Sequence, residues 1–272
     1  MRRQENALLG LAALLVVAAA STLPAFADVL RVGGTGGGLA LILRLADAYH
    51  AGELSTGVRI MPSLGSSGGI KAVTDGALDM AITARPLNSE EQGKELTIIP
   101  LARTPFVLAT SQRDKQSFDS QNLAALLANP QAAWPDGGRI RLIVRPKYET
   151  DNAHWQYFPG MRAVLDAYRR RDDVLSAASD QDNAEAAERT AGSLVAMGLV
   201  QLIAERRQLQ TIAIDGVEPT IENFEKGIYP FEKSFYLVHA PNPTAELENF
   251  IRFTKSPAGA RAMREVGALA VK

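Results

Sequence analysis

The sequence of 272 residues contains no cysteine. This absence excludes a disulfide-stapled scaffold, thiolate metal sites, cysteine nucleophiles and the lipid-bearing cysteine that tethers some exported proteins to a membrane. The chain also lacks an excess of either charge, with 29 Lys and Arg against 30 Asp and Glu. A nucleic-acid-binding protein is expected to present a broad basic surface, so the balance of charge argues against that class.

Histidine is scarce, and His50, His154 and His239 are scattered along the chain. None of them lies in a recognisable metal-binding motif, so neither a metal nor another cofactor is expected. The acidic run over residues 180–183 (Asp-Gln-Asp-Asn) lacks the glycine and the remaining ligands of a calcium loop. A helix cap at Asp182 is the better explanation of this run.

The first 27 residues have the composition of a secretory signal. Arg2 and Arg3 form a charged start, an apolar run covers 7–20, and the segment ends in Ala25-Phe26-Ala27. The apolar run is shorter than the roughly 20 residues of a membrane-spanning helix. We therefore expect cleavage before Asp28 and a periplasmic protein that is soluble and carries no lipid anchor.

The remaining chain alternates between two kinds of segment, and its 46% hydrophobic content suffices for one large core or two modest ones. Strands are expected over 29–32, 58–64, 79–83, 104–110, 139–144 and 235–238, and helices over 39–49, 70–78, 122–128, 161–171, 183–189, 245–253 and 256–267. Strands that alternate with helices pair in parallel through right-handed crossovers. The expected fold class is therefore α/β, in two lobes.

Two glycine-rich segments, 33–38 and 65–69, each stand between a strand and a helix, and both are expected to be loops. In a parallel sheet they lie at the same carboxyl edge and converge. A glycine loop that opens a helix leaves backbone N–H groups free at the positive end of the helix dipole, which favours an anion. The spacing fits neither a P-loop nor a dinucleotide-binding motif. A tight turn without a ligand stays open as the alternative.

Hydroxyls and two arginines supply further donors for an anion. Besides the backbone of Gly34 and Gly36, the candidate donors are Thr35, Ser66, Ser67, Arg85, Arg145 and Thr150. Arg145 follows a second-lobe strand, where its guanidinium can donate paired hydrogen bonds to an oxyanion. Arg85 follows a first-lobe strand. For either arginine, a surface or salt-bridged side chain is the alternative.

The segment 65–69 also satisfies the G-x-S-x-G pattern of the α/β-hydrolase nucleophile elbow. Asp215 and His239 follow in the required order, so a serine hydrolase that uses Ser67, Asp215 and His239 is an alternative function. The elbow would come after only the second strand of the processed chain, which argues against this reading. A protein that is not an enzyme is the main expectation.

The sequence resembles the phosphate-binding protein family of bacterial phosphate ABC transporters, which has the type II periplasmic binding-protein fold. The resemblance is carried by Gly33-Gly34-Thr35-Gly36-Gly37, by 65–72 with 76–81, by 84–87 with Glu90-Glu91, and by 215–223 with 227–230. It implies two lobes, each a mainly parallel sheet flanked by helices, joined by crossing strands near 101–106 and 231–235 and closing by hinge motion. Residues 28–104 and 235–272 would form the first lobe, and 105–234 the second.

The resemblance implies that a monomer captures phosphate or a related small oxyanion and delivers it to a membrane ABC permease. Thr35 and Gly36 would donate from the first glycine segment, Ser66 or Ser67 from the second, and Arg145 with Thr150 from the other lobe.

Three positions depart from the pattern of phosphate-selective members. Ala84 stands where an aspartate is common, and Glu149 and Asp151 follow Arg145 where neutral donors are common. Asp151 is therefore a further candidate ligand residue. Either Glu149 or Asp151 accepts the ligand's proton in place of the absent aspartate, or the ligand is not phosphate. A ligand-sensing periplasmic protein for a different small anion, such as a carboxylate or phosphonate, is the alternative.

Overall fold

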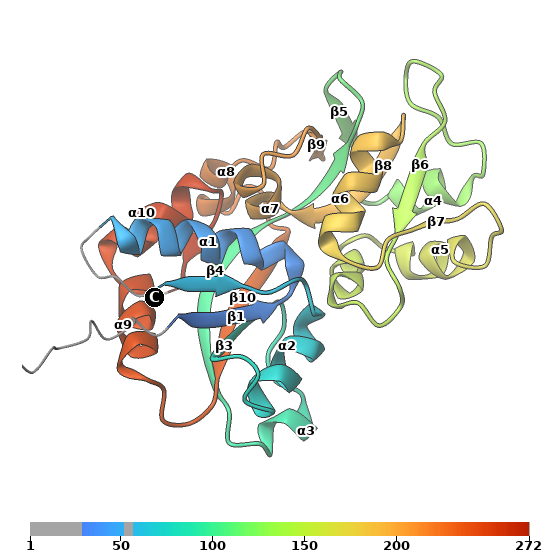
Figure 1. Cartoon of the computed structure of the whole chain (residues 1–272). Coiled ribbons are helices and arrows are strands. Elements are labelled where there is room, and N and C mark those ends of the chain that lie inside the picture. Colours follow the sequence, from blue (N-terminus) through green and yellow to red (C-terminus); the bar gives the residue numbers. More distant parts are fainter. Residues whose placement is uncertain (1–28, 52–56, 272) are drawn as a thin grey trace, which may run out of the picture.

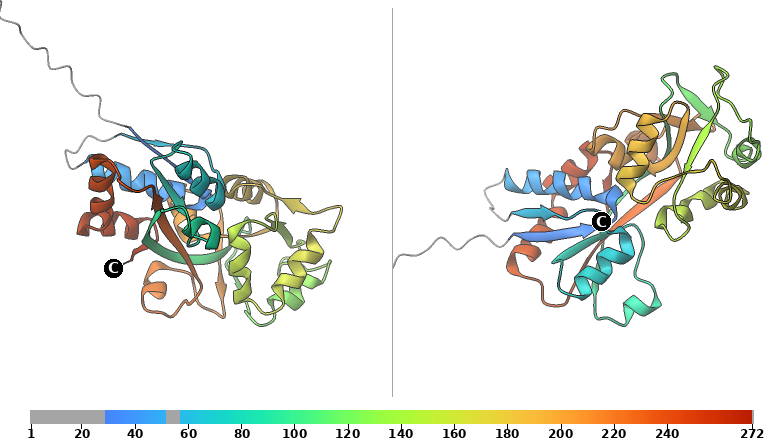
Figure 2. Two further views of the ribbon diagram at one scale, coloured as in Figure 1. Left: turned by 90° about the horizontal axis from the view of Figure 1, so that it is seen from below. Right: turned by 45° about the vertical axis from the view of Figure 1, so that its right-hand side comes forward.

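The structure is a computed structural model of the chain, and residues 29–51 and 57–271 are described. The signal peptide expected over 1–27 lies outside these residues. No helix in the described ranges is long and apolar enough to cross a membrane. Two lobes stand side by side, with two long strands running between them (Figures 1 and 2).

The first lobe is built on three parallel strands. Strand β1 (Leu30–Gly34) lies between β2 (Val58–Ile60) and β3 (Met80–Thr83) and pairs in parallel with both. Helix α1 (Gly36–His50) covers one side of these strands, and α2 (Gly65–Thr74) and α3 (Ser89–Gln92) lie on the other (Figure 1). Helices α9 (Ala245–Thr254) and α10 (Pro257–Glu265) pack against α1 and complete this core from the end of the chain.

The second lobe contains a second set of parallel strands. Strand β6 (Arg141–Val144) pairs in parallel with β7 (Leu175–Ser176) and β8 (Ser193–Gly198), and β5 (Gln116–Phe118) pairs in parallel with β9 (Gln210–Ile214). Its helices are α4 (Leu123–Ala128), the 3-10 helix η1 (Thr150–Tyr157), α5 (Met161–Tyr168), α6 (Asp180–Arg189), α7 (Leu199–Ala204) and α8 (Ile221–Glu225). Buried aromatic side chains, including those of Trp155, Phe158 and Phe231, dominate its main core.

Strands β4 (Thr97–Thr110) and β10 (Glu232–His239) join the lobes. They pair with each other, and every antiparallel pair of strands in the described part of the chain includes one of them, including the pair of β4 with β11 (Leu269–Ala270). Along β4, Leu101 and Ala102 belong to the first core, whereas Phe106 and Leu108 belong to the second. The expected lobe boundaries at 104 and 235 thus fall inside continuous strands, and they stay a prediction.

Both segments that we expected to be glycine loops are helical at the end where they meet a helix. Residues 36–38 form the first turn of α1, and residues 65–69 the first turn of α2. The glycines permit close packing: a Cβ at Gly69 would lie 2.6 Å from Cα of Gly34, and one at Gly38 would lie 2.6 Å from Cδ1 of Ile82. Tertiary packing therefore outweighs the low helix propensity of glycine here.

Other boundaries differ from expectation by a few residues. The strand expected over 58–64 ends at Ile60, the strand expected over 104–110 begins at Thr97, and the strand expected over 235–238 begins at Glu232. The helix expected over 183–189 begins at Asp180, and the helix expected over 161–171 ends at Tyr168. The last helix has Ser256 as N-cap and proline in its first turn, as its sequence predicts.

Gly34 is the strand position at which alanine is expected to be most harmful. Its φ is +123°, and an added Cβ would overlap the carbonyl oxygen of Ile82 on β3. Backbone strain and overpacking together should lower the free energy of unfolding by about 2 to 3 kcal/mol in Gly34→Ala. Gly76→Ala is the matched control, because its φ is +72° but nothing lies within 4 Å of the added Cβ. Urea denaturation would contradict this account if the two variants lost equal stability.

Candidate functional site

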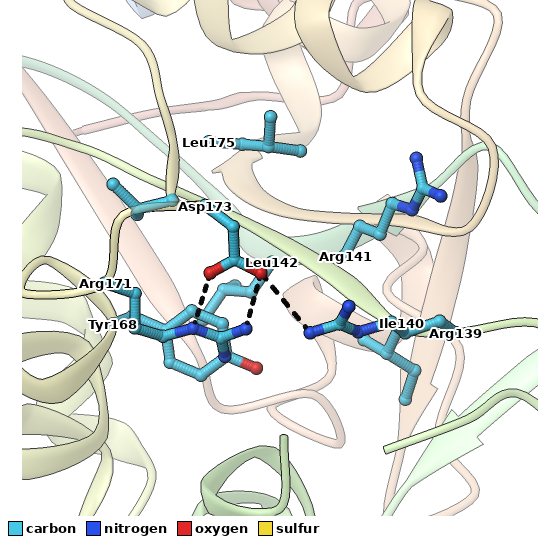
Figure 3. Close-up of a pocket in the computed structure, with 9 residues that line it drawn as sticks. Arg139, Ile140, Arg141, Leu142, Tyr168, Arg171, Asp173 and Leu175 are labelled. Carbon is cyan, nitrogen blue, oxygen red and sulfur yellow. Dashed lines mark hydrogen bonds and ion pairs between the residues drawn. The ribbon is translucent and has the colours of Figure 1, made fainter. Parts of the chain in front are cut away.

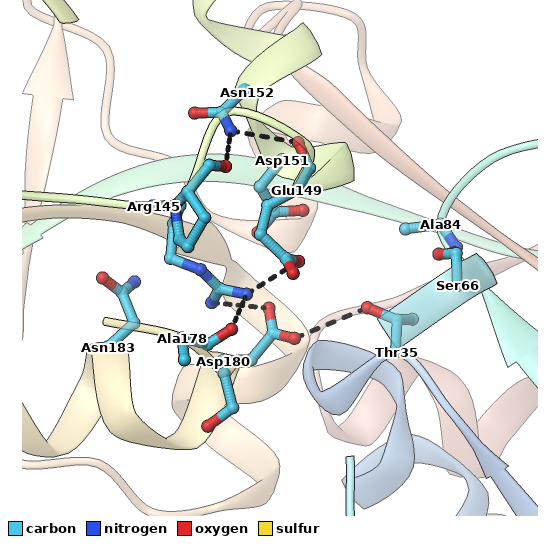
Figure 4. Close-up of polar contacts among 12 residues, drawn as sticks. Thr35, Ser66, Ala84, Arg145, Glu149, Asp151, Asn152, Ala178, Asp180 and Asn183 are labelled. Atoms are coloured by element: carbon cyan, nitrogen blue, oxygen red, sulfur yellow. Dashed lines mark hydrogen bonds and ion pairs between the residues drawn. The ribbon is translucent and has the colours of Figure 1, made fainter. Parts of the chain in front are cut away.

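Charged side chains gather where the start of α1, the second lobe and β10 meet. The buried members are Arg145, Asp151, Asp180 and Lys233, and Glu149 is half-buried; Figure 4 labels all of them except Lys233. We call these five residues the interlobe cluster. It contains two cations and three carboxylates, which is an unusual concentration of charge for a buried place.

The fold explains why these side chains meet. Arg145 directly follows β6, and Asp180 begins the helix that follows the neighbouring strand β7. Parallel strands end at the same edge of a sheet, so both lie at one edge of the second lobe. On β10, Lys233 lies at the same alternating positions as the buried Phe231 and Phe235, and it therefore points into the protein.

Arg145 has hydrogen-bond donors that the described residues leave unused. Its Nη2 donates to Glu149 Oε2 at 2.9 Å and to the carbonyl oxygen of Ala178 at 3.2 Å. Its Nε and Nη1 are buried and find no hydrogen-bond partner among the described residues. Nη1 lies 3.6 Å from Asp180 Oδ1, which is longer than a charge-assisted hydrogen bond. The guanidinium thus keeps two donors for a further acceptor.

Lys233 and Asp151 form the tightest ion pair of the cluster. Lys233 Nζ lies 2.6 Å from Asp151 Oδ1, and the lysine side chain is fully buried. Burial alone would raise the pKa of Asp151, but the positive charge of Lys233, with smaller contributions from His154 and Arg145, outweighs it and holds the pKa below its ordinary value. The carboxylate of Asp151 is therefore ionised and committed to Lys233.

Asp180 connects the second lobe to the first glycine segment. Thr35 Oγ1 donates to Asp180 Oδ2 at 3.5 Å, and Figure 4 shows the two side chains pointing toward each other. The next residue, Gln181, donates from Nε2 to the carbonyl oxygen of Gly36 at 3.1 Å. Asp180 Oδ1 also lies 3.9 Å from Lys233 Nζ. The lobes are thus in contact at the start of α1.

Two titratable groups near the cluster have pKa values shifted by burial. Burial raises the pKa of Glu149, and the charges of Asp180 and Asp151 raise it further against the opposing effect of Arg145. Burial also lowers the pKa of His154, whose ring stacks on Phe106 at a centroid distance of 5.0 Å. Glu149 therefore takes up a proton more readily than an ordinary glutamate, whereas Asp151 does so less readily than an ordinary aspartate.

The second glycine segment brings its two serines to different partners. Ser66 is buried, and its Oγ accepts a hydrogen bond from the backbone N–H of Ala84 at 3.0 Å. Ser67 Oγ accepts from Arg85 Nη2 at 2.8 Å. Arg85 also donates to both carboxylate oxygens of Glu91, at 2.7 and 2.8 Å, so its guanidinium is engaged within the first lobe.

The remaining candidates lie at the ends of secondary-structure elements. Gly34 ends β1, Thr35 is the N-cap of α1, Gly36 begins that helix, and Thr150 is the first residue of η1 next to Asp151. Asp180 therefore links Thr35 of the first glycine segment to Arg145, which the resemblance places on the opposite side of the ligand. Whether these residues contact a ligand stays a prediction.

The three residues of the alternative hydrolase triad are each engaged elsewhere. Ser67 accepts from Arg85, Asp215 Oδ1 accepts from the backbone N–H of Ser120 at 2.8 Å, and His239 Nδ1 lies 2.7 Å from the carbonyl oxygen of Ala240. Within the described residues, no hydrogen bond joins any two of the three. The geometry gives the triad no support.

The described residues contain no group of three acidic or histidine side chains that could hold a metal ion. In the acidic run 180–183, the N-cap of α6 is Ser179 rather than Asp182, which instead occupies the third helical position and completes a capping box. The expectation of a cap was thus right in kind but misplaced by three residues.

Sequence reasoning missed Lys233 and Asp180 as members of the cluster. Lys233 could have been found, because it interrupts the alternating apolar positions Phe231, Phe235 and Leu237 of one strand. Asp180 carries no such signal, since an aspartate in the first turn of a helix is common for local reasons.

A polar hollow of about 230 Å³ lies at the end of β6 that is opposite to Arg145. Two arginines contact Asp173 there, with 3.5 Å between Arg139 Nη2 and Oδ2 and 2.9 Å between Arg171 Nε and Oδ1 (Figure 3). Apolar side chains also line the hollow. Hydrogen bonding to Arg171 lowers the pKa of Asp173. These are exposed ion pairs of the kind that contribute little to stability, and the hollow is separate from the interlobe cluster.

Comparisons with known proteins place this geometry in context. A family model described as a PBP superfamily domain matches residues 19–258. A protein from Clostridium perfringens, assigned as a phosphate ABC transporter substrate-binding protein and solved with bound phosphate, is 17% identical with a TM-score of 0.74, covering 90% of this chain and 100% of its own. No curated protein sequence matches the chain.

Two further solved structures show how widely the fold is shared. A phosphate-binding protein from Stenotrophomonas maltophilia is 12% identical with a TM-score of 0.64, covering 90% of this chain and 91% of its own. A reduced form of OxyR from N. meningitidis is 9% identical with a TM-score of 0.58, covering 90% of this chain and 100% of its own. At these identities, the similarity establishes the fold alone.

Proposed function

Since the chain belongs to the PBP superfamily and has the α/β fold of type II periplasmic binding proteins, we propose that it captures a small oxyanion between its two lobes. The observation that carries this proposal is the state of Arg145. Its guanidinium is 6% exposed, and two of its nitrogen atoms have unmet donors beside the start of α1. Buried donors are normally satisfied, so an additional acceptor is the simplest way to complete this site.

The chemistry of the surrounding groups suits an oxyanion. The N-terminus of α1, a helix of 15 residues, favours negative charge through its dipole and its free N–H groups. Thr35 and Ser66 add hydroxyl donors from the first lobe, and Arg145 adds the charged donors Nε and Nη1 from the second lobe. Groups from both lobes would then contact one ligand, which would stabilise the closed arrangement by differential affinity.

In this proposal, the ligand is phosphate or a related small oxyanion, and it is bound by Gly34, Thr35, Gly36, Ser66, Arg145 and Thr150, while Asp151 stays paired with Lys233 and does not contact the ligand. Ser67 and Arg85 would support the second glycine segment through their mutual hydrogen bond rather than by contact with the ligand. The protein would work as a periplasmic monomer, without catalysis, and would deliver its ligand to an ABC permease. These assignments extend the resemblance of the sequence to the phosphate-binding family.

Isothermal titration calorimetry of the purified protein with phosphate, sulfate, methylphosphonate and acetate tests the proposal. We expect one-to-one binding of at least one of these anions, because the site has unmet donors on one side and a helix N-terminus on the other. Binding of phosphate would support transport of that ion. A clear preference for acetate or methylphosphonate would keep the oxyanion site and replace phosphate as its ligand. Absence of binding by all four anions would refute the proposal.

A further inference from the structure

The carboxylate of Asp180 occupies the place between the start of α1 and the two buried cations. It lies 3.5 Å from Thr35 Oγ1, 3.6 Å from Arg145 Nη1 and 3.9 Å from Lys233 Nζ. The residue is 4% exposed and belongs to α6 of the second lobe. A negative group of the chain itself thus lies in the position that the proposed function gives to the oxyanion.

The first glycine segment packs closely against this carboxylate and its neighbours. A Cβ at Gly36 would first meet Oε1 of Gln181 and would then lie 2.9 Å from Asp180 Oδ2. A Cβ at Gly37 would lie 3.1 Å from Lys233 Nζ and 3.2 Å from Asp180 Oδ1. A side chain at either position would therefore crowd Asp180 together with Gln181 or Lys233.

Asp180 occupies this place but makes no short hydrogen bond to the donors around it. Its contacts of 3.5 to 3.9 Å exceed the 2.7 to 2.9 Å typical of charge-assisted hydrogen bonds. Arg145 Nε and Nη1 remain without a hydrogen-bond partner in the described residues. The carboxylate fixed to α6 does not reach these donors at hydrogen-bond distance, and we expect a free oxyanion, which has no such tether, to do so. The arrangement favours replacement of the tethered carboxylate by a free anion.

Resting on the proposed function, we propose that Asp180 is a specificity-determining residue that occupies the oxyanion position until a free anion displaces it. While it is in place, it joins the lobes, together with the hydrogen bond from Gln181 to Gly36. Once displaced, it remains beside the ligand as a third carboxylate opposite the two cations of the cluster. Like charges repel strongly in such a place, so Asp180 lowers affinity for anions in general and for doubly charged anions most.

Calorimetry with Asp180→Asn tests this role, with Asp182→Asn as the matched control. Both changes remove one negative charge from the first turn of α6, but Asp182 is exposed and only caps the helix. We expect Asp180→Asn to bind the anions at least about tenfold more tightly than the wild type, with a larger gain for sulfate than for acetate, because a like charge has been removed. Asp182→Asn is expected to change affinity less than twofold.

An unchanged or weaker affinity in Asp180→Asn, with binding by the wild type intact, would overturn the inference and leave the proposed function standing. An equal gain in Asp182→Asn would also overturn it, because the effect would then come from the charge of the helix rather than from the cluster. Asp180→Ser, which keeps a good helix-start residue, is the second variant if Asp180→Asn folds poorly.

Small-angle X-ray scattering without ligand gives a readout that does not depend on anion binding. We expect the radius of gyration of Asp180→Asn to exceed that of the wild type. The radius of Asp182→Asn should equal that of the wild type, because of these two aspartates only Asp180 contacts the other lobe. Equal radii for wild type and Asp180→Asn would refute the role of Asp180 in closure. If no variant bound any of the four anions, the proposed function would fail, and scattering would still decide whether Asp180 holds the lobes together.

Discussion

Asp151→Asn is expected to lower the free energy of unfolding by about 3 to 5 kcal/mol, because it leaves the charge of Lys233 buried without its partner. The ammonium group lies in a side chain with 0% exposure, 2.6 Å from the carboxylate that the substitution removes. The next carboxylate, that of Asp180, lies 3.9 Å from Lys233 Nζ, which is too far for a charge-assisted hydrogen bond. Urea denaturation followed by circular dichroism measures the loss.

Asp75→Asn is the control for this prediction. Asp75 pairs with Lys71 on the surface of α2, where both side chains are more than half exposed, and the loss should stay below about 1 kcal/mol. The double variant Asp151→Leu with Lys233→Met, which removes both charges, is expected to recover much of the stability lost in Asp151→Asn. Similar losses in Asp151→Asn and Asp75→Asn would show that the buried pair is not the cause.

The same pair gives a pH dependence of known sign. The pKa of Asp151 is lower in the folded protein than its ordinary value, because Lys233 and its neighbours outweigh the effect of burial. Its contribution to stability is therefore complete above the ordinary pKa of an aspartate and is lost as the pH falls through the folded value. Acid unfolding of Asp151→Asn should accordingly depend less on pH than that of the wild type in this acidic range.

Arg145→Ala is expected to weaken anion binding by at least about tenfold, and by more than a hundredfold if both unmet donors contact the ligand, because charge-assisted hydrogen bonds are the strong ones. Arg145→Lys should keep the positive charge that Arg145→Ala removes, but it lacks the planar set of guanidinium N–H donors. It should therefore recover only part of the affinity. Titration calorimetry with the anion that the wild type binds best provides the measurement.

Arg141→Ala is the matched control for Arg145→Ala. Arg141 begins the same strand, its side chain is exposed, and it lines the hollow at the opposite end of β6. We expect it to leave anion affinity unchanged. If Arg141→Ala and Arg145→Ala weakened binding equally, the interlobe cluster would not be the anion site, and the hollow at Arg141 would become the better candidate.

Local patterns predicted those parts of the fold that local physics determines. The strand before Gly33 and the helix after it follow from alternating and helical spacing, whereas the approach of Thr35 to Arg145 depends on how the two lobes meet. The helical first turn over 65–69 did not follow. Glycine and serine favour turns locally, and the close packing of Gly69 on Gly34, which accompanies the helical turn, is a tertiary contact that local patterns do not reveal.

The charge balance of the cluster was beyond local prediction for a different reason. Lys233 and Asp180 come from distant parts of the chain, and their proximity to Arg145 depends on how the two lobes meet. The sequence did show that Glu149 and Asp151 stand where phosphate-selective members commonly have neutral hydrogen-bond donors. The cations that hold them, Arg145 and Lys233, became apparent as partners only in three dimensions.

The place of β10 between β3 and β4 has a consequence for biosynthesis. Every residue of the main second-lobe core lies between Phe106 and Phe231, so that core can form as soon as this stretch has emerged. The first-lobe core instead needs Phe235 and Leu237 on β10, as well as the helices that follow. Although its strands are made first, we therefore expect the first lobe to fold last, because its core needs the end of the chain.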